Sequence, residues 1–162
     1  MTDDVLLELS VTLGERLKGI GATLTCAESC TGGFIAKAIT DISGSSSYFE
    51  RGYVTYSNEA KHEMLGVTHE SLQLYGAVSE AVVNEMAQGA LKVAHADFAV
   101  SVSGIAGPDG GSVAKPVGTV WFGFAAKDGR AYAIRQYFPG GRLQVRQLAA
   151  EFALRVLIEK FL

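Results

Sequence analysis

The segment that decides the fold is Ala27-Glu28-Ser29-Cys30-Thr31-Gly32-Gly33, which joins two stretches of regular pattern. A short strand-like stretch, Ala22–Cys26, precedes it, and a helix-like stretch, Phe34–Ile39, follows it. A strand that ends in a polar, glycine-bearing turn and then enters a helix is how α/β proteins build ligand sites. Because a helix start leaves backbone N–H groups unpaired, this turn predicts an anion site beside two candidate nucleophiles, Ser29 and Cys30.

Working outward, hydrophobic spacing and turn residues predict an alternation of helices and strands. The predicted helices are Val5–Lys18, Thr31–Thr40, Asn58–Leu65 capped by Ser57, His69–Leu74, Glu80–Ala94 capped by Ser79, and Arg142–Leu162. The predicted strands are Ala22–Cys26, Gly52–Tyr56, Phe98–Val102, Val117–Ala126 and Ala131–Phe138, the last two forming a hairpin at Asp128-Gly129. This order predicts an α/β protein, a three-layer α/β/α sandwich with a mixed, mostly parallel sheet of about five strands.

Composition restricts the class of protein. The 162 residues suit one domain, 1–162, and 48% hydrophobic residues indicate a compact core. A net charge of −3 argues against a nucleic-acid partner, which usually requires a basic face. No apolar run approaches the roughly 18–20 residues that span a bilayer, so no membrane association is expected. The start, Met1-Thr2-Asp3-Asp4, is acidic rather than a basic, apolar signal peptide, so we expect the cytoplasm.

The sulfur and imidazole side chains do not form a recognisable metal motif. Cys26 and Cys30 are the two cysteines, and they would have to close a very small loop to form a disulfide. The three histidines, His62, His69 and His95, are scattered along the chain. We therefore expect no structural disulfide, no metal and no cofactor.

Ser29 and Lys61 are the residues with the clearest chemical potential. A serine hydroxyl in this turn is either a helix-capping group or a nucleophile, and a nucleophile requires a base. Lys61 follows the predicted strand Gly52–Tyr56, whose end would lie near Ser29 if the two strands are neighbours. An ordinary lysine pKa near 10.4 leaves only about one molecule in 2,500 neutral at pH 7. Lys61 is thus either a solvated surface lysine or, if burial lowers its pKa, the base.

Two further features are candidates for ligand binding. The run Ser103-Gly104-Ile105-Ala106-Gly107-Pro108-Asp109-Gly110-Gly111 leaves a buried strand, and glycine-rich backbone can approach an anion closely. It lacks the ending of a Walker A loop, so it is equally consistent with a simple connection. Arg142 and Arg146 lie one helical turn apart at the start of the last helix, either facing a phosphate together or solvated. Aromatic residues such as Tyr56 either stack on a ring or belong to the core.

Taken together, these motifs resemble the CinA C-terminal domain family, the nicotinamide mononucleotide deamidases of the PncC type. The resemblance covers essentially the whole chain in register, and its motifs are specific. The matching stretches are Ala27–Gly33, Gly44-Ser45-Ser46 with Tyr48-Phe49, Gly52–Lys61, Gly76–Ser79, Ser103–Pro108 and Pro116–Val120.

The resemblance implies an enzyme that hydrolyses the carboxamide of nicotinamide mononucleotide to nicotinic acid mononucleotide and ammonia, in pyridine nucleotide recycling. It implies a small-molecule substrate and a homodimer. Two alternatives remain at this point: a non-catalytic nucleotide-binding or regulatory module, and a serine amidase acting on another small amide. Intact Ser29 and Lys61 favour the enzyme, because a degenerate module would be expected to have lost one of them.

Carried onto this sequence, the family's proposed catalytic pair is Ser29, which attacks the amide carbon, and neutral Lys61, which takes its proton. Backbone N–H groups near Gly32 and Gly33, or those of the loop Ser103–Gly107, are expected to hold the oxyanion. The expected substrate contacts are Thr31, Gly32, Gly33, Tyr56, Asn58, Ser103, Gly104, Ile105, Ala106, Gly107 and Arg142. The family often has Gly-Asp-Arg before the last helix, whereas this chain has Gly140-Gly141-Arg142, which weakens any role for position 141 but not for Arg142.

Overall fold

The computed structural model describes residues 2–162, so Met1 of the acidic N-terminal segment lies outside the described residues. The elements are α1 Thr2–Ile20, β1 Leu24–Glu28, α2 Phe34–Thr40, a 3₁₀ turn Ser45–Ser47, β2 Tyr53–Val54, α3 Asn58–Leu65, α4 His69–Tyr75, α5 Glu80–Ala94, β3 Phe98–Gly104, β4 Thr119–Ala126, β5 Ala131–Tyr137, α6 Arg142–Val156 and a π-helical turn Leu157–Phe161. The predicted order of helices and strands is confirmed.

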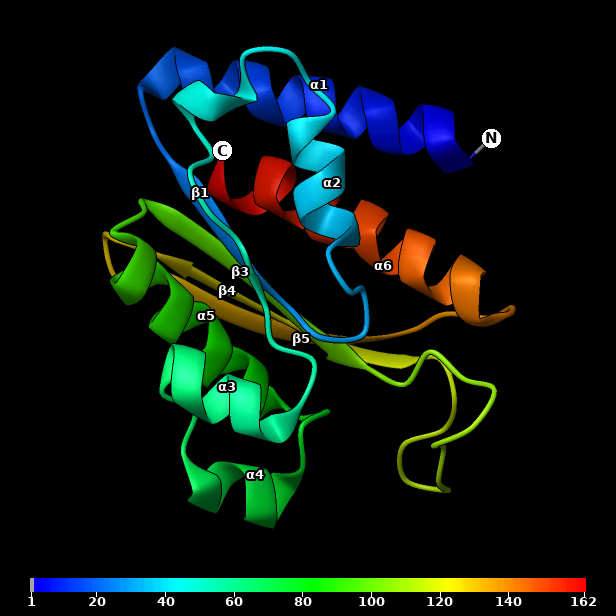
Figure 1. Ribbon diagram of the computed structural model, residues 1–162. Coiled ribbons are helices and arrows are strands. Elements are labelled where there is room, and N and C mark those ends of the chain that lie inside the picture. The colour runs from blue at the N-terminus through cyan, green and yellow to red at the C-terminus, as the bar shows by residue number, and fades with distance from the viewer. Residues whose placement is uncertain (1) are drawn as a thin grey trace.

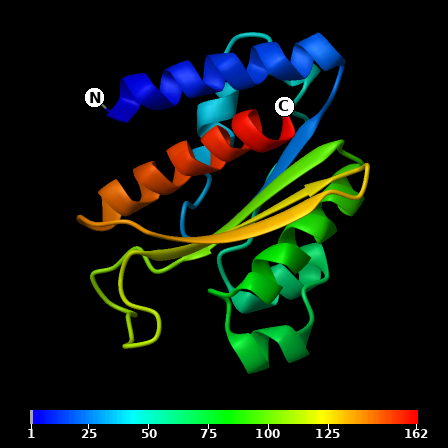
Figure 2. The same cartoon turned by 180° about the vertical axis from the view of Figure 1, so that it is seen from behind.

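The strands form one mixed sheet in the order β2-β1-β3-β4-β5. β1 pairs in parallel with both β2 and β3, while β3–β4 and β4–β5 are antiparallel pairs, so in the described chain β4 alone runs against the other strands. Figures 1 and 2 show α1, α2 and α6 on one face of this sheet and α3, α4 and α5 on the other. The predicted three-layer α/β sandwich is therefore confirmed.

Two apolar cores follow from the alternation of side chains along the buried strands. On β3, Phe98, Val100 and Val102 face the larger core beneath α1, α2 and α6, whereas Ala99 faces the smaller core beneath α3 and α5. Ser101 on the second face donates a hydrogen bond to the Val83 carbonyl of α5 at 2.5 Å. Small side chains on this face let α5 lie close to the sheet.

The parallel strands bring three chain segments to one edge of the sheet. Glu28 at the end of β1 is level with Val54 of β2 and Val102 of β3. Two backbone hydrogen bonds continue the pairing beyond the strands: Thr55 N–H donates to the Glu28 carbonyl at 2.8 Å, and Ser29 N–H donates to the Val102 carbonyl at 3.0 Å. The segments that follow β1, β2 and β3 therefore meet, as expected for a ligand site in an α/β sheet.

The turn after β1 is longer than its sequence suggested. The helix predicted from Thr31 begins at Phe34, because Gly32 and Gly33 have φ of +57° and +103°. These left-handed conformations are accessible to glycine at little cost and interrupt the helix. The predicted strand Ala22–Cys26 is likewise displaced toward the turn, with β1 running from Leu24 to Glu28.

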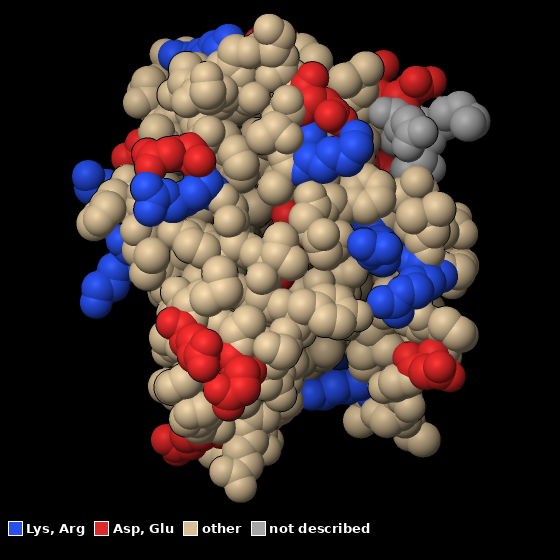
Figure 3. Space-filling model, viewed as in Figure 1, with Lys and Arg blue, Asp and Glu red and all other residues tan. Residues whose placement is uncertain are grey.

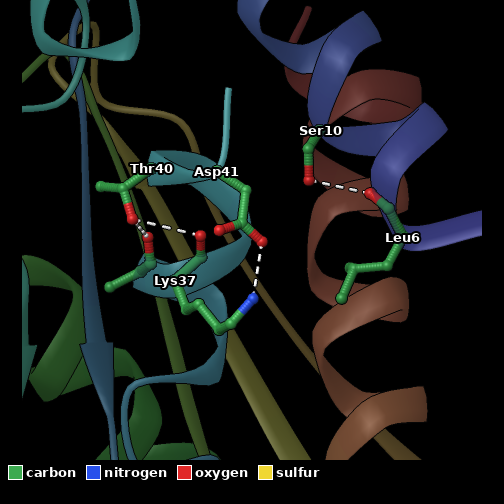
Figure 4. A network of polar contacts seen from close by, with 6 residues as sticks. Leu6, Ser10, Lys37, Thr40 and Asp41 are labelled. Atoms are coloured by element: carbon green, nitrogen blue, oxygen red, sulfur yellow. Dashed lines mark hydrogen bonds and ion pairs between the residues drawn. The ribbon is translucent and has the colours of Figure 1, made fainter. Parts of the chain in front are cut away.

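Figure 4 shows polar contacts within α1 and within α2 and its C-cap residue. The Thr40 hydroxyl donates to the Ala36 carbonyl at 2.8 Å, and Lys37 pairs with Asp41 at 2.7 Å. On α1, the Ser10 hydroxyl donates to the Leu6 carbonyl at 2.8 Å. Each of these contacts stays within one helix or its cap, so apolar packing joins α1 to α2.

Acidic and basic side chains are interspersed on the face that Figure 3 shows, some of them in contact with one another and others surrounded by uncharged residues. This mixed surface matches the small net charge of −3. Among residues 2–162, no helix combines the length and apolar character required to cross a membrane.

Gly89 lets α5 contact α3 closely, which matters because α3 carries Lys61. A Cβ atom at this position would lie 1.9 Å from the Leu65 carbonyl oxygen at the end of α3. We expect Gly89→Ala to destabilise the protein by about 1–3 kcal/mol, because the two helices must separate. Chemical denaturation measures this change.

The matched control is Gly19→Ala near the end of α1, where a Cβ atom would have nothing within 4 Å. Because alanine loses less entropy than glycine in a helix, this variant should be more stable by about 0.5–1 kcal/mol. Equal effects of the two substitutions would contradict the close α3–α5 contact.

Candidate active site

A cavity of about 300 Å³ opens where the three parallel strands end. The predicted residues that line it are Ser29, Tyr56, Asn58, Lys61, Ser103, Gly104, Ile105, Ala106, Gly107 and Arg142. It is also lined by Cys30, the second candidate nucleophile, by Asp109 and Gly110 of the predicted glycine-rich loop, and by Ala77 and Val78. Ala77 and Val78 lie in the connection between α4 and α5. Their place at the cavity depends on how these helices pack, which no local sequence motif shows.

A larger cavity of about 530 Å³ lies between α5 and β5, but its lining contains no lysine, histidine or cysteine. Its one serine, Ser79, uses its hydroxyl to cap α5 by accepting from the Val82 N–H. The smaller cavity, which holds a nucleophile beside a base, is therefore the candidate active site.

Ser29 is held at the end of β1 with its hydroxyl facing a buried amine. The Lys61 Nζ lies 2.9 Å from the Ser29 Oγ, and the Ser29 hydroxyl is 3.4 Å from the Tyr56 carbonyl oxygen. The N-cap of α2 is Gly33, which makes no side-chain capping bond. Ser29 is therefore not the capping residue that its sequence position also suggested.

Lys61 reaches this point because only Thr55, Tyr56 and Ser57 separate the short strand β2 from the start of its helix. Ser57 caps α3 by accepting from the Ala60 N–H at 3.0 Å, as predicted. Lys61 lies on the inner face of α3 and is only 1% exposed. Besides Ser29, its amine contacts the Thr55 carbonyl at 3.0 Å and the Tyr56 carbonyl at 3.2 Å.

These contacts suit both protonation states of Lys61. A neutral amine has two N–H groups for the carbonyls of Thr55 and Tyr56 and a lone pair for the Ser29 O–H. An ammonium group donates to all three oxygens, and the Ser29 O–H can then donate to the Tyr56 carbonyl. The proton can therefore move between Oγ and Nζ without leaving a polar atom unpaired.

Burial lowers the pKa of Lys61 from 10.5 to about 8, since a charged amine is poorly solvated there. Among the side chains that the structure describes, residues 4–162, no carboxylate lies within ion-pair distance of Lys61. With this pKa, about one lysine in ten is neutral at pH 7. Lys61 can thus act as a base.

Cys30, the other candidate nucleophile, lines the same cavity but is a neutral thiol. Burial raises its pKa to about 12. Because the thiolate is the reactive form of cysteine, Cys30 is nearly unreactive at neutral pH. This favours Ser29, the residue ranked first from the sequence.

The anion site predicted at the start of α2 is already filled by the chain itself. The Glu28 carboxylate accepts from the Thr31 hydroxyl at 2.6 Å and from the N–H groups of Gly33, Ile35 and Ala36 at 3.2, 2.9 and 3.0 Å. Gly32 N–H donates to the Ser29 carbonyl at 3.0 Å. The expectation that Gly32 and Gly33 hold an oxyanion is therefore wrong.

The predicted substrate contacts with Thr31, Gly32 and Gly33 have no support in the geometry either, because none of these residues lines the cavity. In the glycine-rich loop, Ile105 N–H donates to the Thr119 carbonyl at 2.9 Å and is not free for a ligand. Ala106 and Gly107 N–H groups have no acceptor in residues 2–162 and remain available.

Arg142 and Arg146, at the start of α6, contact different parts of the site. Arg142 lines the cavity, where its guanidinium donates to the Gly107 carbonyl at 2.8 Å and to the Tyr56 hydroxyl at 3.0 Å. Arg146 donates to the carbonyls of Cys30 and Thr31 at 3.0 and 3.2 Å and lies outside the cavity lining. Only Arg142 is placed to meet a ligand in the cavity.

Comparison with known proteins decides the family. A model of the CinA C-terminal domain matches residues 7–161. The chain belongs to the CinA C-terminal domain family. Proteins named nicotinamide-nucleotide amidohydrolase PncC are similar to it: that of Enterobacter agglomerans is 63% identical over 100% of this chain and 99% of its own, and that of Escherichia coli K12 is 61% identical over 100% and 98%.

Solved members of the CinA family have the same fold. The crystal structure of competence/damage-inducible protein CihA from Agrobacterium tumefaciens has a TM-score of 0.93 and 44% identity, covering 95% of this chain and 94% of the other. That of competence damage-inducible protein A from Klebsiella pneumoniae has a TM-score of 0.93 and 42% identity, covering 96% of each chain.

For this CinA-family chain, the burial of Lys61 predicts a pH-dependent stability. The folded pKa of about 8 lies below the unfolded value of 10.5, so between these pH values the unfolded state binds more protons. Relative to Lys61→Met, the free energy of unfolding of the native protein should therefore rise through this window, by at most about 3 kcal/mol.

Denaturation at a series of pH values measures the difference between the two proteins. Lys92→Met, which removes an exposed lysine from α5, controls for the loss of one positive charge. A difference between native protein and Lys61→Met that does not change with pH would contradict the lowered pKa.

Proposed function

We propose that this chain hydrolyses the carboxamide of nicotinamide mononucleotide, giving nicotinic acid mononucleotide and ammonia. The observation that carries the proposal is the 2.9 Å contact between Lys61 Nζ and Ser29 Oγ in a cavity. The names of relatives 61–63% identical over essentially their whole length support the substrate. We also propose a single domain, a homodimer, and a cytoplasmic role in pyridine nucleotide recycling.

In the first half of the proposed reaction, the Ser29 Oγ attacks the amide carbon while its proton passes to the neutral Lys61 amine. The carbonyl electron pair moves to oxygen, giving a tetrahedral intermediate. The Lys61 ammonium then returns the proton to the amide nitrogen, the C–N bond breaks, and ammonia leaves. Ser29 remains as an ester of the pyridine carboxylate.

In the second half, water attacks the ester carbon and Lys61 takes its proton. Collapse of the second intermediate returns that proton to the Ser29 oxygen and releases the carboxylic acid product. Lys61 thus ends neutral, as it began. The carbonyls of Thr55 and Tyr56 hold the amine in the same place through both halves.

For the oxyanion we propose the Cys30 N–H together with the free amides of Ala106 and Gly107. Ser29 carbonyl oxygen accepts from Gly32 N–H inside the turn, so the N–H of the same peptide, that of Cys30, points away from the turn. Cys30 follows the nucleophile directly and lines the cavity. Its N–H has no acceptor in residues 2–162. Preorganised donors of this kind are worth about 10²–10³ in rate.

Arg142 is the proposed ligand for the substrate phosphate, since a guanidinium suits bidentate phosphate binding. It lines the cavity and donates hydrogen bonds to the Gly107 carbonyl and the Tyr56 hydroxyl. Tyr56 is 60% exposed and accepts a hydrogen bond from Arg142, and we propose that its ring contacts the cationic pyridine ring. Asn58 is proposed to orient the ring or the lysine.

Ammonia release from nicotinamide mononucleotide tests the proposal directly. The native protein should release ammonia, and both Ser29→Ala and Lys61→Ala should be slower by about 10³-fold or more, because each removes half of a coupled pair. Lys92→Met should match the native protein. No ammonia from the native protein would contradict this substrate, and full activity in Ser29→Ala would contradict the nucleophile.

The pH dependence tests the base. Because Lys61 must be neutral to accept a proton, kcat/KM should rise with pH and level off, with an apparent pKa of about 8. Lys61→Arg keeps the positive charge but cannot lose it, so this variant should be inactive up to about pH 10. A rate that falls as pH rises from 6 to 8 would contradict Lys61 as base.

A further inference from the structure

Glu28 is a buried acidic residue that the proposed chemistry does not use. It is the last residue of β1, has 0% exposure, and does not line the cavity. No lysine or arginine in the described residues forms an ion pair with it. A buried carboxylate without a cation is costly unless hydrogen bonds satisfy it, so its placement calls for an explanation.

The hydrogen bonds of Glu28 enclose the turn that carries Ser29. Its Oε1 accepts from the Thr31 hydroxyl, Gly33 N–H and Ile35 N–H, and its Oε2 accepts from Ala36 N–H at 3.0 Å and the Cys26 thiol at 3.6 Å. The residue immediately before Ser29 is thereby tied to the start of α2. The carboxylate also lies at the positive end of this helix, which partly compensates its charge.

Two other contacts hold the same turn from outside. Ser29 N–H donates to the Val102 carbonyl of β3, and Arg146 of α6 donates to the carbonyls of Cys30 and Thr31. The turn is thus held by Glu28 at the start of α2, by Arg146 of α6, and by the backbone of β3.

We propose that Glu28 is a positioning residue for Ser29: its carboxylate fixes the Ser29–Gly33 turn on α2 and so sets the Oγ beside Lys61. The inference rests on the proposed function for its kinetic consequence. The hydrogen bonds of Glu28, however, are made within the protein, so their effect on the reactivity of Ser29 can be tested without the nucleotide.

Two substitutions, Glu28→Gln and Thr31→Val, remove hydrogen bonds of the Glu28 carboxylate and leave Ser29 and Lys61 unsubstituted. In Glu28→Gln the amide nitrogen cannot accept hydrogen bonds, and wherever it lies it meets at least two of the donors that the carboxylate satisfied. Thr31→Val removes one donor, the hydroxyl at 2.6 Å, from a fully buried position, while Thr31→Ser keeps it. Glu85→Gln is the matched control, because Glu85 accepts from Thr68 N–H and the Ser71 hydroxyl at the start of α4, away from the cavity.

Two readouts are measured for each variant: kcat and KM on nicotinamide mononucleotide, and the rate at which a small fluorophosphonate labels Ser29. In labelling, Oγ displaces fluoride from phosphorus and its proton is lost, and mass spectrometry locates the adduct, with Ser29→Ala as the blank. Glu28→Gln should lose about 10–100-fold in kcat and in labelling rate with little change in KM, because a small displacement of reacting atoms is costly. Thr31→Val should lose about 3–10-fold, and Thr31→Ser and Glu85→Gln should keep the native rates.

The proposal is overturned if Glu28→Gln folds and keeps native kcat and labelling, or if its loss lies in KM alone. If Glu28→Gln does not fold, Thr31→Val and Thr31→Ser decide by the same criteria. If the native protein releases no ammonia but Ser29 is labelled, the proposed function fails, and the labelling rates alone decide the role of Glu28.

Discussion

Lys61 has an amine inside the protein, beside a hydroxyl and two peptide carbonyls, and no carboxylate in the described chain is close enough to pair with it. A surface lysine at this distance from Ser29 would remain protonated and could not accept a proton. Burial makes the neutral form accessible at a cost to stability, an exchange that is common at functional sites. The chemistry of the turn after β1 therefore depends on how completely α3 buries one side chain.

The fold supplies that burial through elements far apart in sequence. Parallel pairing of β2 with β1 makes Thr55 and Tyr56 neighbours of Ser29. α3 begins at Asn58, two residues after Tyr56, and brings Lys61 to the same point. α5 supports α3 closely at Gly89. β3 supports the serine turn from the other side, and α6 holds it with Arg146. The sheet and the helices on both of its faces thus help to position either Ser29 or Lys61.

Local patterns predicted much of this arrangement. The capping serines Ser57 and Ser79 and the element order were accessible, since each depends on local spacing. Spacing alone left Lys61 either at the surface or beside Ser29, and the resemblance to the family favoured the second position, which the structure shows. The occupation of the N–H groups at the start of α2 by Glu28 could not be predicted. A strand pattern does not show whether its last side chain turns toward the helix or the solvent. Arg146 was misread for a similar reason: helical spacing gives a shared face with Arg142 but not what that face contacts.

A direct titration of Lys61 tests the central claim. With lysine labelled at ¹³Cε, the resonance of Lys61, assigned by comparison with Lys61→Met, can be followed by NMR from pH 6 to 11. A pKa of about 8 is expected, well below the ordinary value of 10.5. A Lys61 resonance that titrates at or above the ordinary value would contradict the account, because the amine beside Ser29 would then be charged at neutral pH and unable to act as a base.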